Sequence, residues 1–324
     1  MLSDRLTLAL DTGTIALPGE GRIAVAGATA RDDLSMLPRE RITVISHFYP
    51  DYQAFKTAGY NVNIAFEGPF VATIIALPRA KKAAQEMVAK AARATDGPLI
   101  IDGQKTSGVA SMLKALKARA LVGEVLSKAH GKIFAVTGGD FSDWLHDETH
   151  IDGFVTAPGV FSADGIDPGS AALASALPKV LKGRVIDLGA GWGYLSHAVL
   201  QREGVTHVDL VEADAVALDL ARKNITDSRA TFLWDDATTY VGEAADHIVT
   251  NPPFHTDRTA NPDLGRAFIR HAAKLLKPKG TLWLVANRHL PYESTLEERF
   301  QTVQLLNQSA SYKIYTATRP KSPR

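Results

Sequence analysis

The sequence has 324 residues, of which 45% are hydrophobic and 22% charged, and its formal net charge is +1. This length and composition predict a soluble protein of two domains. No stretch is apolar enough for a membrane helix or a signal peptide, so we expect a cytoplasmic protein without membrane contact. The absence of cysteine excludes disulfides, cysteine-ligated metal sites and enzymes that attack with a cysteine nucleophile.

The first half of the chain has the pattern of an α/β domain. Strand-like runs lie at 21–28, 73–78 and 98–102, and a helix is expected over 79–94. A stretch with a single acid, Glu124, carries the basic residues Lys105, Lys114, Lys117, Arg119, Lys128 and Lys132. Such a cluster is either a solvated surface or a surface that contacts phosphate.

The second half alternates strands and helices more clearly. Residues 140–152, acidic and rich in polar and aromatic side chains, are the expected linker, and we place the domains at 1–155 and 156–324. The predicted strands are 184–188, 207–212, 231–234, 246–250 and 281–286, and the predicted helices are 194–202, 213–224 and 267–276. This alternation favours a mostly parallel sheet. The runs 302–306 and 313–316 are too close for a crossover helix and predict an antiparallel hairpin at one sheet edge.

The first half also resembles a damaged copy of the second. GRIAVAGA at 21–28 aligns with GRVIDLGA at 183–190, and TIIALP at 73–78 aligns with IVTNPP at 248–253. Polar or glycine positions of the second copy are replaced in the first, in the pairs Asp187 with Val25, Gly191 with Thr29 and Asn251 with Ala76. We therefore expect two tandem domains, of which only the second has kept its ligand groups.

A glycine-rich turn is the first candidate for chemistry. DLGAGWG at 187–193 follows a strand and opens a helix, and its glycines, Gly189, Gly191 and Gly193, let the backbone turn sharply and approach a ligand. Nucleotide-binding folds hold pyrophosphate on such a turn. Here Asp187 at the strand end would repel phosphate, and it suits a cationic ligand that carries an ammonium and a sulfonium. Ala190, within the turn, is expected to contact the same ligand.

Two acids follow the next strands. Glu212 closes the second strand, where an acid can accept both ribose hydroxyls, and Asp236 follows the third, where it can accept adenine amino hydrogens. Their neighbours Ala213 and Ala237 are expected to contact the cofactor as well. One such acid alone is more typical of a solvated cap, but both in register with the glycine turn indicate a cofactor that contains a nucleoside.

The catalytic candidates form one segment, and they are Asn251, Pro252, Pro253, Phe254 and His255. This loop ends the fourth strand, beside the glycine turn, and the two prolines make it rigid. The amide oxygen of Asn251 and the carbonyl of Pro252 can accept both hydrogens of one planar amino group, and Phe254 offers a face for its base. Accepting both hydrogens moves the nitrogen towards tetrahedral geometry and frees its lone pair. His255 could take up the released proton or contact phosphate, or it could be structural.

These residues resemble the class I methyltransferases with an Asn-Pro-Pro-aromatic signature, and more narrowly the bacterial ribosomal RNA small-subunit guanine-N2 methyltransferases. The likeness is carried by the glycine turn and by GVFS at 159–162, DPGS at 167–170, NPPFH at 251–255, ANRHLPY at 286–292 and YKIY at 312–315. Relatives that methylate glutamine or adenine amino groups usually have Tyr where this chain has Phe254. That family has two tandem Rossmann-like domains, the first without a working cofactor site.

The resemblance implies methyl transfer from S-adenosyl-L-methionine to the N2 amine of a guanine in 16S ribosomal RNA, free or in the 30S subunit. It places Phe161 and the stretch from Asp167 to Ser170 in the cofactor or substrate pocket, where the sequence alone predicts a loop and a helix cap. The target base has to leave its stack to reach a deep pocket. The alternatives are a protein glutamine-N5 methyltransferase, an adenine-N6 nucleic-acid methyltransferase and a non-catalytic RNA-binding assembly factor. We expect a monomer without bound metal. A net charge of +1 is modest for an enzyme that acts on RNA, so the sequence specifies the substrate less closely than the reaction.

Overall fold

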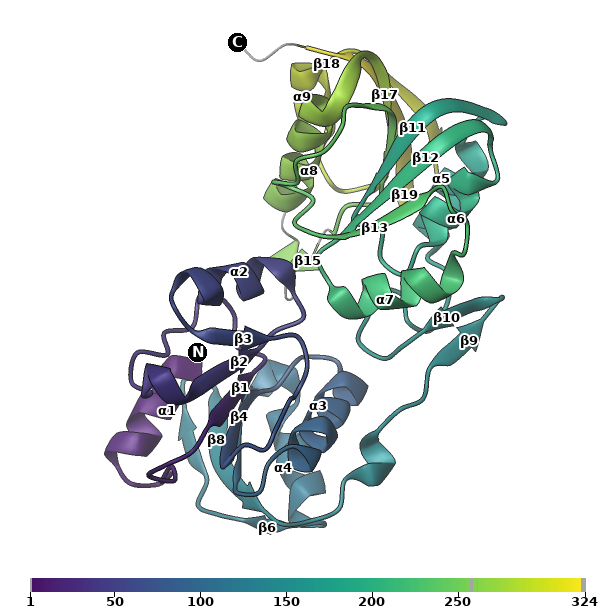
Figure 1. Ribbon diagram of the computed structural model, residues 1–324. Coiled ribbons are helices and arrows are strands. Elements are labelled where there is room, and N and C mark those ends of the chain that lie inside the picture. The colour runs from purple at the N-terminus through teal and green to yellow at the C-terminus, as the bar shows by residue number, and fades with distance from the viewer. Residues whose placement is uncertain (1, 254, 257–258, 261, 322–324) are drawn as a thin grey trace. The chain divides into compact units, whose positions relative to one another are not determined.

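The computed structural model describes residues 2–253, 255–256, 259–260 and 262–321 (Figure 1). The chain forms two compact units, Met1–Glu148 and Thr149–Arg324, which we call unit 1 and unit 2. The boundary that we predicted, after residue 155, lies a few residues inside unit 2. The reason is the hairpin of β9 (Thr149–Ile151) and β10 (Phe154–Thr156), in which Val155 exchanges backbone hydrogen bonds with the side chain of Asn224 in unit 2.

Unit 1 is built on one sheet with the strand order β3-β2-β1-β4-β5-β8-β6, and β7 also pairs with β8. The strands from β3 to β5 are parallel, and β8 is antiparallel to each strand that it pairs with, β5, β6 and β7. The strands are β1 (Ile23–Ala26), β2 (Ile42–Ile45), β3 (Asn61–Asn63), β4 (Ala72–Ala76), β5 (Leu99–Gln104), β6 (Leu121–Val122), β7 (Leu126–Lys128) and β8 (Gly131–Thr137). The α-helices are α1 (Leu2–Asp11), α2 (Tyr49–Thr57), α3 (Lys81–Arg93) and α4 (Val109–Lys117).

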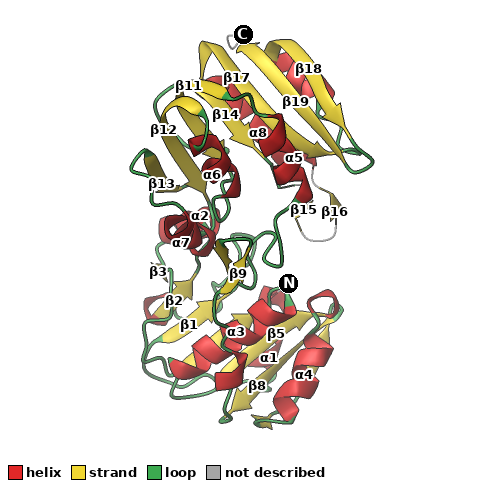
Figure 2. Ribbon diagram, turned by 90° about the vertical axis from the view of Figure 1, so that its right-hand side faces the viewer, coloured by secondary structure: helices red, strands yellow, loops and turns green. Residues whose placement is uncertain are grey.

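Unit 2 has a sheet of the order β13-β12-β11-β14-β17-β19-β18 (Figure 2). The strands from β13 to β17 are parallel, and β18 and β19 form the predicted antiparallel hairpin at the edge. The strands are β11 (Val180–Leu188), β12 (Glu203–Glu212), β13 (Ala230–Trp234), β14 (Ala245–Thr250), β17 (Leu276–Asn287), β18 (Phe300–Gln308) and β19 (Tyr312–Pro320), and β15 (His255–Thr256) pairs with β16 (Thr259–Ala260). The helices are α5 (Pro168–Ala176), α6 (Tyr194–Leu200), α7 (Ala215–Asn224), α8 (Pro262–Leu275) and α9 (Glu293–Arg299).

Both faces of the unit 2 sheet are covered (Figure 1). On one face α8 and α9 bury an apolar cluster that includes Ile186 and Leu188, and on the other α5, α6 and α7 bury a cluster that includes Val185. Because side chains alternate along a strand, Asp187 of β11 points to the same face as Val185, towards α6. Two covered faces explain why these strands are apolar almost throughout.

The strand orders of the two units correspond position by position, and this supports duplication. Val25 pairs with Ile74 in unit 1, and Asp187 pairs with Val249 in unit 2, as the sequence alignment requires. The copies differ after the first strand. Unit 2 continues into α6, whereas residues 27–41 of unit 1, all of which are described, contain only the short 3-10 helix Arg39–Arg41. The expected α/β fold, with a mostly parallel sheet in each unit and an antiparallel hairpin at the C-terminal edge, is confirmed.

Candidate active site

The glycine turn lies at the carboxyl end of β11, where the strand order of the sheet reverses between β11 and β14. A Cβ added at Gly191 would meet no atom within 4 Å, so this position faces open space. Gly193 has a φ of +94°, and a Cβ there would come within 2.9 Å of Ile225. The turn therefore needs glycine for close packing at one position and leaves room for a ligand at another.

Asp187 is fully buried beneath this turn, with 0% of its surface exposed. Its Oδ2 accepts a 2.7 Å hydrogen bond from the Ser196 hydroxyl of α6, but its buried Oδ1 has no hydrogen-bond partner among the described residues. Burial, reinforced by the nearby charge of Glu212, raises the pKa of Asp187 to about 7, although the Ser196 bond acts in the opposite direction. An unpaired buried carboxylate oxygen is costly, and a cationic donor would satisfy it.

Glu212, at the end of β12, holds the glycine turn in place. Its Oε2 accepts from the Gly191 amide at 2.7 Å, and its Oε1 accepts from the Asp214 amide at 2.8 Å. Burial raises the pKa of Glu212, and these backbone bonds partly offset that shift. Each carboxylate oxygen retains a further lone pair, so two hydroxyls of a ligand could still be accepted. Its neighbour Ala213 accepts a bond from the Trp234 indole through its carbonyl.

Asp236 follows β13, as predicted, but its side chain is engaged in a local turn. Its Oδ1 accepts from the Thr238 amide at 2.8 Å and from the Thr238 hydroxyl at 2.7 Å. Ala237 is buried, with 4% of its surface exposed. The turn fixes the carboxylate next to the carboxyl ends of the strands, and its Oδ2 makes no hydrogen bond to a described residue.

Asn251 directly follows β14 and is held next to the glycine turn, because the Thr250 hydroxyl donates to the Leu188 carbonyl at 2.7 Å. The amide nitrogen of Asn251 donates to Asp167 Oδ2 and to the Ser170 hydroxyl, both at 2.9 Å. Of the next residues, Pro252 is buried and Pro253 exposed. Phe254 lies outside the described residues, as does the side chain of His255, so their predicted roles stay predictions.

A hollow of about 380 Å³, including its mouth, lies over the turn. Six of the residues that we predicted for the site line this hollow, and they are Phe161, Asp167, Gly189, Ala190, Gly191 and Asn251. Gly193, Asp187, Glu212, Ala213, Asp236 and Ala237 do not line it. The Phe161 side chain is 53% exposed, and its carbonyl accepts a 2.9 Å bond from the buried Trp192 indole.

Sequence reasoning missed two contributors to this site. Trp192 within the glycine turn lines the hollow and anchors the 161 loop, and Ser196 is the hydrogen-bond partner of Asp187. The position of Ser196 gives a usable signal, because it lies in the first turn of the helix that opens directly after the glycines. Nothing in the local sequence around Trp192 indicates that its indole reaches residue 161.

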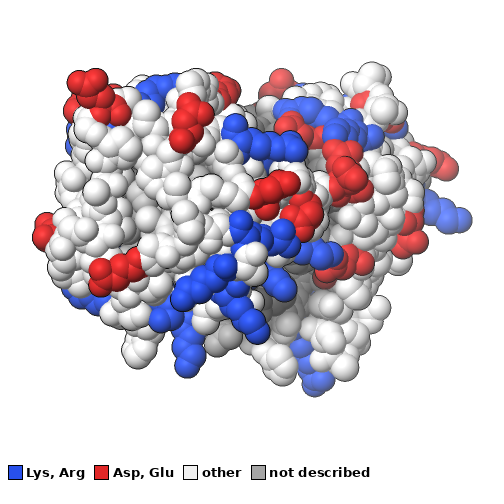
Figure 3. Space-filling view, turned by 90° about the horizontal axis from the view of Figure 1, so that it is seen from below, with Lys and Arg blue, Asp and Glu red and all other residues white. Residues whose placement is uncertain are grey.

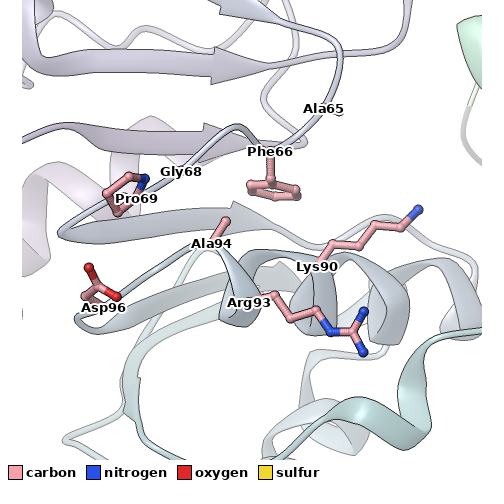
Figure 4. Close-up of a pocket in the computed structure, with 8 residues that line it drawn as sticks. All are labelled: Ala65, Phe66, Gly68, Pro69, Lys90, Arg93, Ala94 and Asp96. Carbon is pink, nitrogen blue, oxygen red and sulfur yellow. The ribbon is translucent and has the colours of Figure 1, made fainter.

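A larger hollow, of about 900 Å³, lies in unit 1 (Figure 4). It is lined by Ala65, Phe66, Gly68, Pro69, Lys90, Arg93, Ala94 and Asp96. These residues precede β4 and β5, so the hollow is at the amino ends of the parallel strands and at the end of α3. The unit 2 site lies at the carboxyl ends. The unit 1 hollow is therefore not the counterpart of that site, despite its larger volume.

Two further expectations concern absences. Within the described ranges, no group of three or more histidine or acidic side chains is arranged to hold a metal ion. No described helix combines the length and the apolar character that a bilayer crossing requires. The expected monomer, the absence of metal and the cytoplasmic location stay predictions.

Comparison with known proteins agrees with this geometry. Residues 152–316 match the family described as Methyltransferase small domain, which covers half of the chain. The solved 16S rRNA N2 G1207 methyltransferase (RsmC) of T. thermophilus, in complex with AdoMet and guanosine, superposes with a TM-score of 0.80 at 27% identity and covers 95% of this chain and 91% of its own. The fold and the site define a methyltransferase with two tandem domains.

Curated relatives narrow the class. A protein of Shewanella loihica named ribosomal RNA small subunit methyltransferase C is 31% identical over 265 residues, 76% of each chain. One of Shewanella sp. (strain MR-4) with the same name is 29% identical over 83% of each chain. The chain belongs to the ribosomal RNA small subunit methyltransferase C family.

Proposed function

We propose that this protein transfers a methyl group from S-adenosylmethionine to the N2 amine of a guanine in 16S ribosomal RNA. The observation that carries the proposal is the amide of Asn251, whose nitrogen is bonded on one side, which leaves its oxygen to accept from a substrate amine at the edge of the sheet where the glycine turn lies. The relative of known structure was solved with AdoMet and guanosine and acts at G1207. We infer that the same position is the target here.

The residues around the turn fit S-adenosylmethionine. The unpaired Oδ1 of Asp187 would accept from its ammonium group, and the open space at Gly191 would admit the ligand next to the backbone. Glu212 would accept the ribose hydroxyls, and the free oxygen of Asp236 the adenine amino hydrogens. Ala213 and Ala237 supply small side chains beside these two acids. A pyrophosphate would instead meet a buried carboxylate, which is unfavourable.

The chain's own residues then prepare the amine for transfer. The Asn251 amide oxygen and the Pro252 carbonyl accept its two hydrogens, so the nitrogen lone pair leaves conjugation with the ring and is aimed at the cofactor. When bound, S-adenosylmethionine would supply a methyl group on a sulfonium; the amine nitrogen would form a bond to that carbon in line as the S–CH3 bond breaks and the neutral thioether leaves. Most of the rate acceleration therefore comes from positioning. Phe254 would stack on the base, and His255 would take up the proton that leaves the amine.

Family membership favours RNA over the alternative substrates, since the relatives carry the name of ribosomal RNA methyltransferases. A protein glutamine or an adenine would present a similar planar amino group, so the loop alone does not separate them. The complete set of polar groups in unit 2 argues against a non-catalytic assembly factor. The guanine N2 amine must leave its helix or loop to reach Asn251, so we expect local unpairing of the RNA.

We also propose that unit 1 docks the RNA. Lys114 and Lys117 are exposed on α4, and neither forms an ion pair with a described residue. Lysine and arginine side chains gather below the centre of the face in Figure 3. Not all of the predicted cluster is available, because Arg119 makes a two-pronged ion pair with Asp143 at 2.9 Å and stacks on Trp144. The unpaired lysines are the better candidates for phosphate contact.

Replacing Asn251 tests the reaction. Asn251→Ala should reduce kcat by about 10²–10³ and leave cofactor affinity nearly unchanged, because the amide acts on the amine as it becomes tetrahedral. Transfer of labelled methyl to small-subunit RNA, followed by mass spectrometry of the digested nucleosides, gives both rate and product. N2-methylguanosine is expected. N6-methyladenosine or methylglutamine as the product would refute the substrate, and full activity of the variant would refute the mechanism.

A further inference from the structure

We propose that Asp167 and Ser170 are positioning residues that fix the amide of Asn251 with its oxygen towards the substrate amine. The inference deepens the proposed function and rests on it. A free asparagine amide can rotate by half a turn and exchange its oxygen and nitrogen. In the reversed orientation it would present two donors to an amine that itself has two hydrogens, and the site could not act. Something must therefore select one orientation.

The contacts of the amide supply that selection. An ionised carboxylate accepts hydrogen bonds and cannot donate them, so Asp167 Oδ2 at 2.9 Å requires the nitrogen of Asn251 on its side. The Ser170 hydroxyl oxygen, also at 2.9 Å, takes the second hydrogen. With both N–H groups used, the amide oxygen faces away from α5. Reversing the amide would place its oxygen against a carboxylate, which is strongly unfavourable in a half-buried site.

The two partners are themselves held rigidly. Asp167 caps α5, because its Oδ2 also accepts the Ser170 amide at 2.7 Å, and Pro168 begins the helix. Ser170 is 7% exposed. A Cβ at Gly169 would lie 3.0 Å from Asp167 Oδ2 and 3.1 Å from the Tyr312 ring, so glycine lets this helix start lie close to both without displacing either. The sequence DPGS thus combines two anchors with the residues that set their position.

The arrangement also assigns a different task to Asp167 from the one that the sequence implied. Asp167 lines the hollow, as expected for a cofactor or substrate contact, but its hydrogen bonds go to Ser170 and Asn251. It acts through Asn251, 84 residues later in the chain. Its loss should therefore lower the rate of transfer and leave the binding of cofactor nearly unchanged.

Two conservative variants test the inference. Asp167→Asn keeps the size of the side chain, but its amide can either cap α5 through its oxygen or donate to a reversed Asn251 amide through its nitrogen, so it no longer selects one Asn251 orientation strictly. We expect kcat to fall about 10- to 100-fold, as for other groups that orient a functional residue. Ser170→Ala removes one acceptor and should cost less. Cofactor affinity and Tm should stay close to the wild-type values. Matched controls are Ser175→Ala on the same helix, whose hydroxyl bonds only the Ala171 carbonyl, and Asp140→Asn in an exposed turn of unit 1.

Epistasis separates positioning from general damage. If Asp167 acts through Asn251, then Asp167→Asn should have little further effect in an Asn251→Ala background, measured in single turnovers with excess enzyme. An equal fold-loss in both backgrounds would overturn the proposal. So would an unchanged kcat of Asp167→Asn in an enzyme whose wild type is active. A wild-type protein without methyl transfer to RNA would instead refute the proposed function.

A charge swap gives an independent check. Asn251→Asp should be nearly inactive, because its carboxylate would meet that of Asp167 at hydrogen-bond distance. Adding Asp167→Asn should recover activity, since the new amide at 167 can donate to the new carboxylate at 251, which still presents an oxygen to the amine. A double variant no more active than Asn251→Asp would contradict the clamp.

Discussion

We expect the buried carboxylate of Asp187 to make the binding of S-adenosylmethionine sensitive to pH, and the size of this effect follows from the pKa of the carboxyl group. In the free protein the pKa of Asp187 is raised to about 7 by burial, so the group is mostly protonated at pH 6. Binding an ammonium group requires the carboxylate and therefore expels that proton. Linkage then predicts that affinity for S-adenosylmethionine is about tenfold weaker at pH 6 than at pH 8, which is ~1.4 kcal/mol.

The sign of the effect on stability follows from the same shift. A carboxyl whose pKa is higher in the folded state than in the unfolded one stabilises the fold at low pH, and this contribution is lost as pH rises through about 7. The free protein should lose stability between pH 6 and pH 8. Bound cofactor pairs the charge, so the rise in Tm that it produces should grow over the same interval.

Isothermal titration calorimetry at pH 6 and pH 8, in two buffers of different ionisation enthalpy, measures both the affinity and the proton release. Asp187→Asn keeps the Ser196 contact within reach but cannot ionise, so it should bind weakly at both values and without pH dependence. Equal wild-type affinities at pH 6 and pH 8, with no proton released at pH 6, would refute the assignment of Asp187 as the ammonium acceptor.

Two other predictions concern the two units. Calorimetry should give one cofactor molecule per chain, because unit 1 has Val25, Thr29 and Ala76 in place of the ligand groups, and a second site would refute its degeneracy. Replacing Lys114 and Lys117 together by Glu should weaken RNA binding and lower its salt dependence by about one unit of slope per lysine, with cofactor affinity unchanged. Unchanged RNA affinity at low salt would exclude α4 as a docking surface.

The sequence predicted the parts of the site that depend on strand ends. The place of Asp187, Glu212 and Asn251 at one edge of the sheet could be predicted because parallel strands bring their carboxyl ends together there, and the apolar runs indicate where each strand stops. The duplication was visible for the same reason, since pairing of Val25 with Ile74 and of Asp187 with Val249 preserves the alignment in space. The local sequence pattern and the strand topology are sufficient to predict which residues lie at this edge of the sheet.

The hydrogen-bond partners of the site side chains could not be predicted from the pattern of strands and helices. Asp167 contacts Asn251 only after the whole sheet and α5 have assembled. The bonds from Thr238 to Asp236 belong to the turn after β13, where we had predicted only a contact with the cofactor. The compact units divide a few residues before the boundary that we expected, because the β9–β10 hairpin is bonded to Asn224, a side chain far along the chain. In each case the arrangement depends on a hydrogen bond between residues far apart in the chain or within one particular turn. The periodicity of the sequence does not indicate such a bond.

The first helix of each unit shows that the two copies use the same framework for different purposes. In unit 2, Asp167 and Ser170 at the start of α5 accept hydrogen bonds from Asn251, for which we propose a catalytic role. In unit 1, α1 supplies Arg5, whose guanidinium makes a two-pronged, fully buried ion pair with Asp102 of β5. Removing one member of such a pair leaves an uncompensated buried charge and typically costs about 3–5 kcal/mol. Unit 1 thus uses an ion pair to stabilise its own fold, whereas in unit 2 the Oδ1 of Asp187 has no hydrogen-bond partner among the described residues and could accept from a ligand.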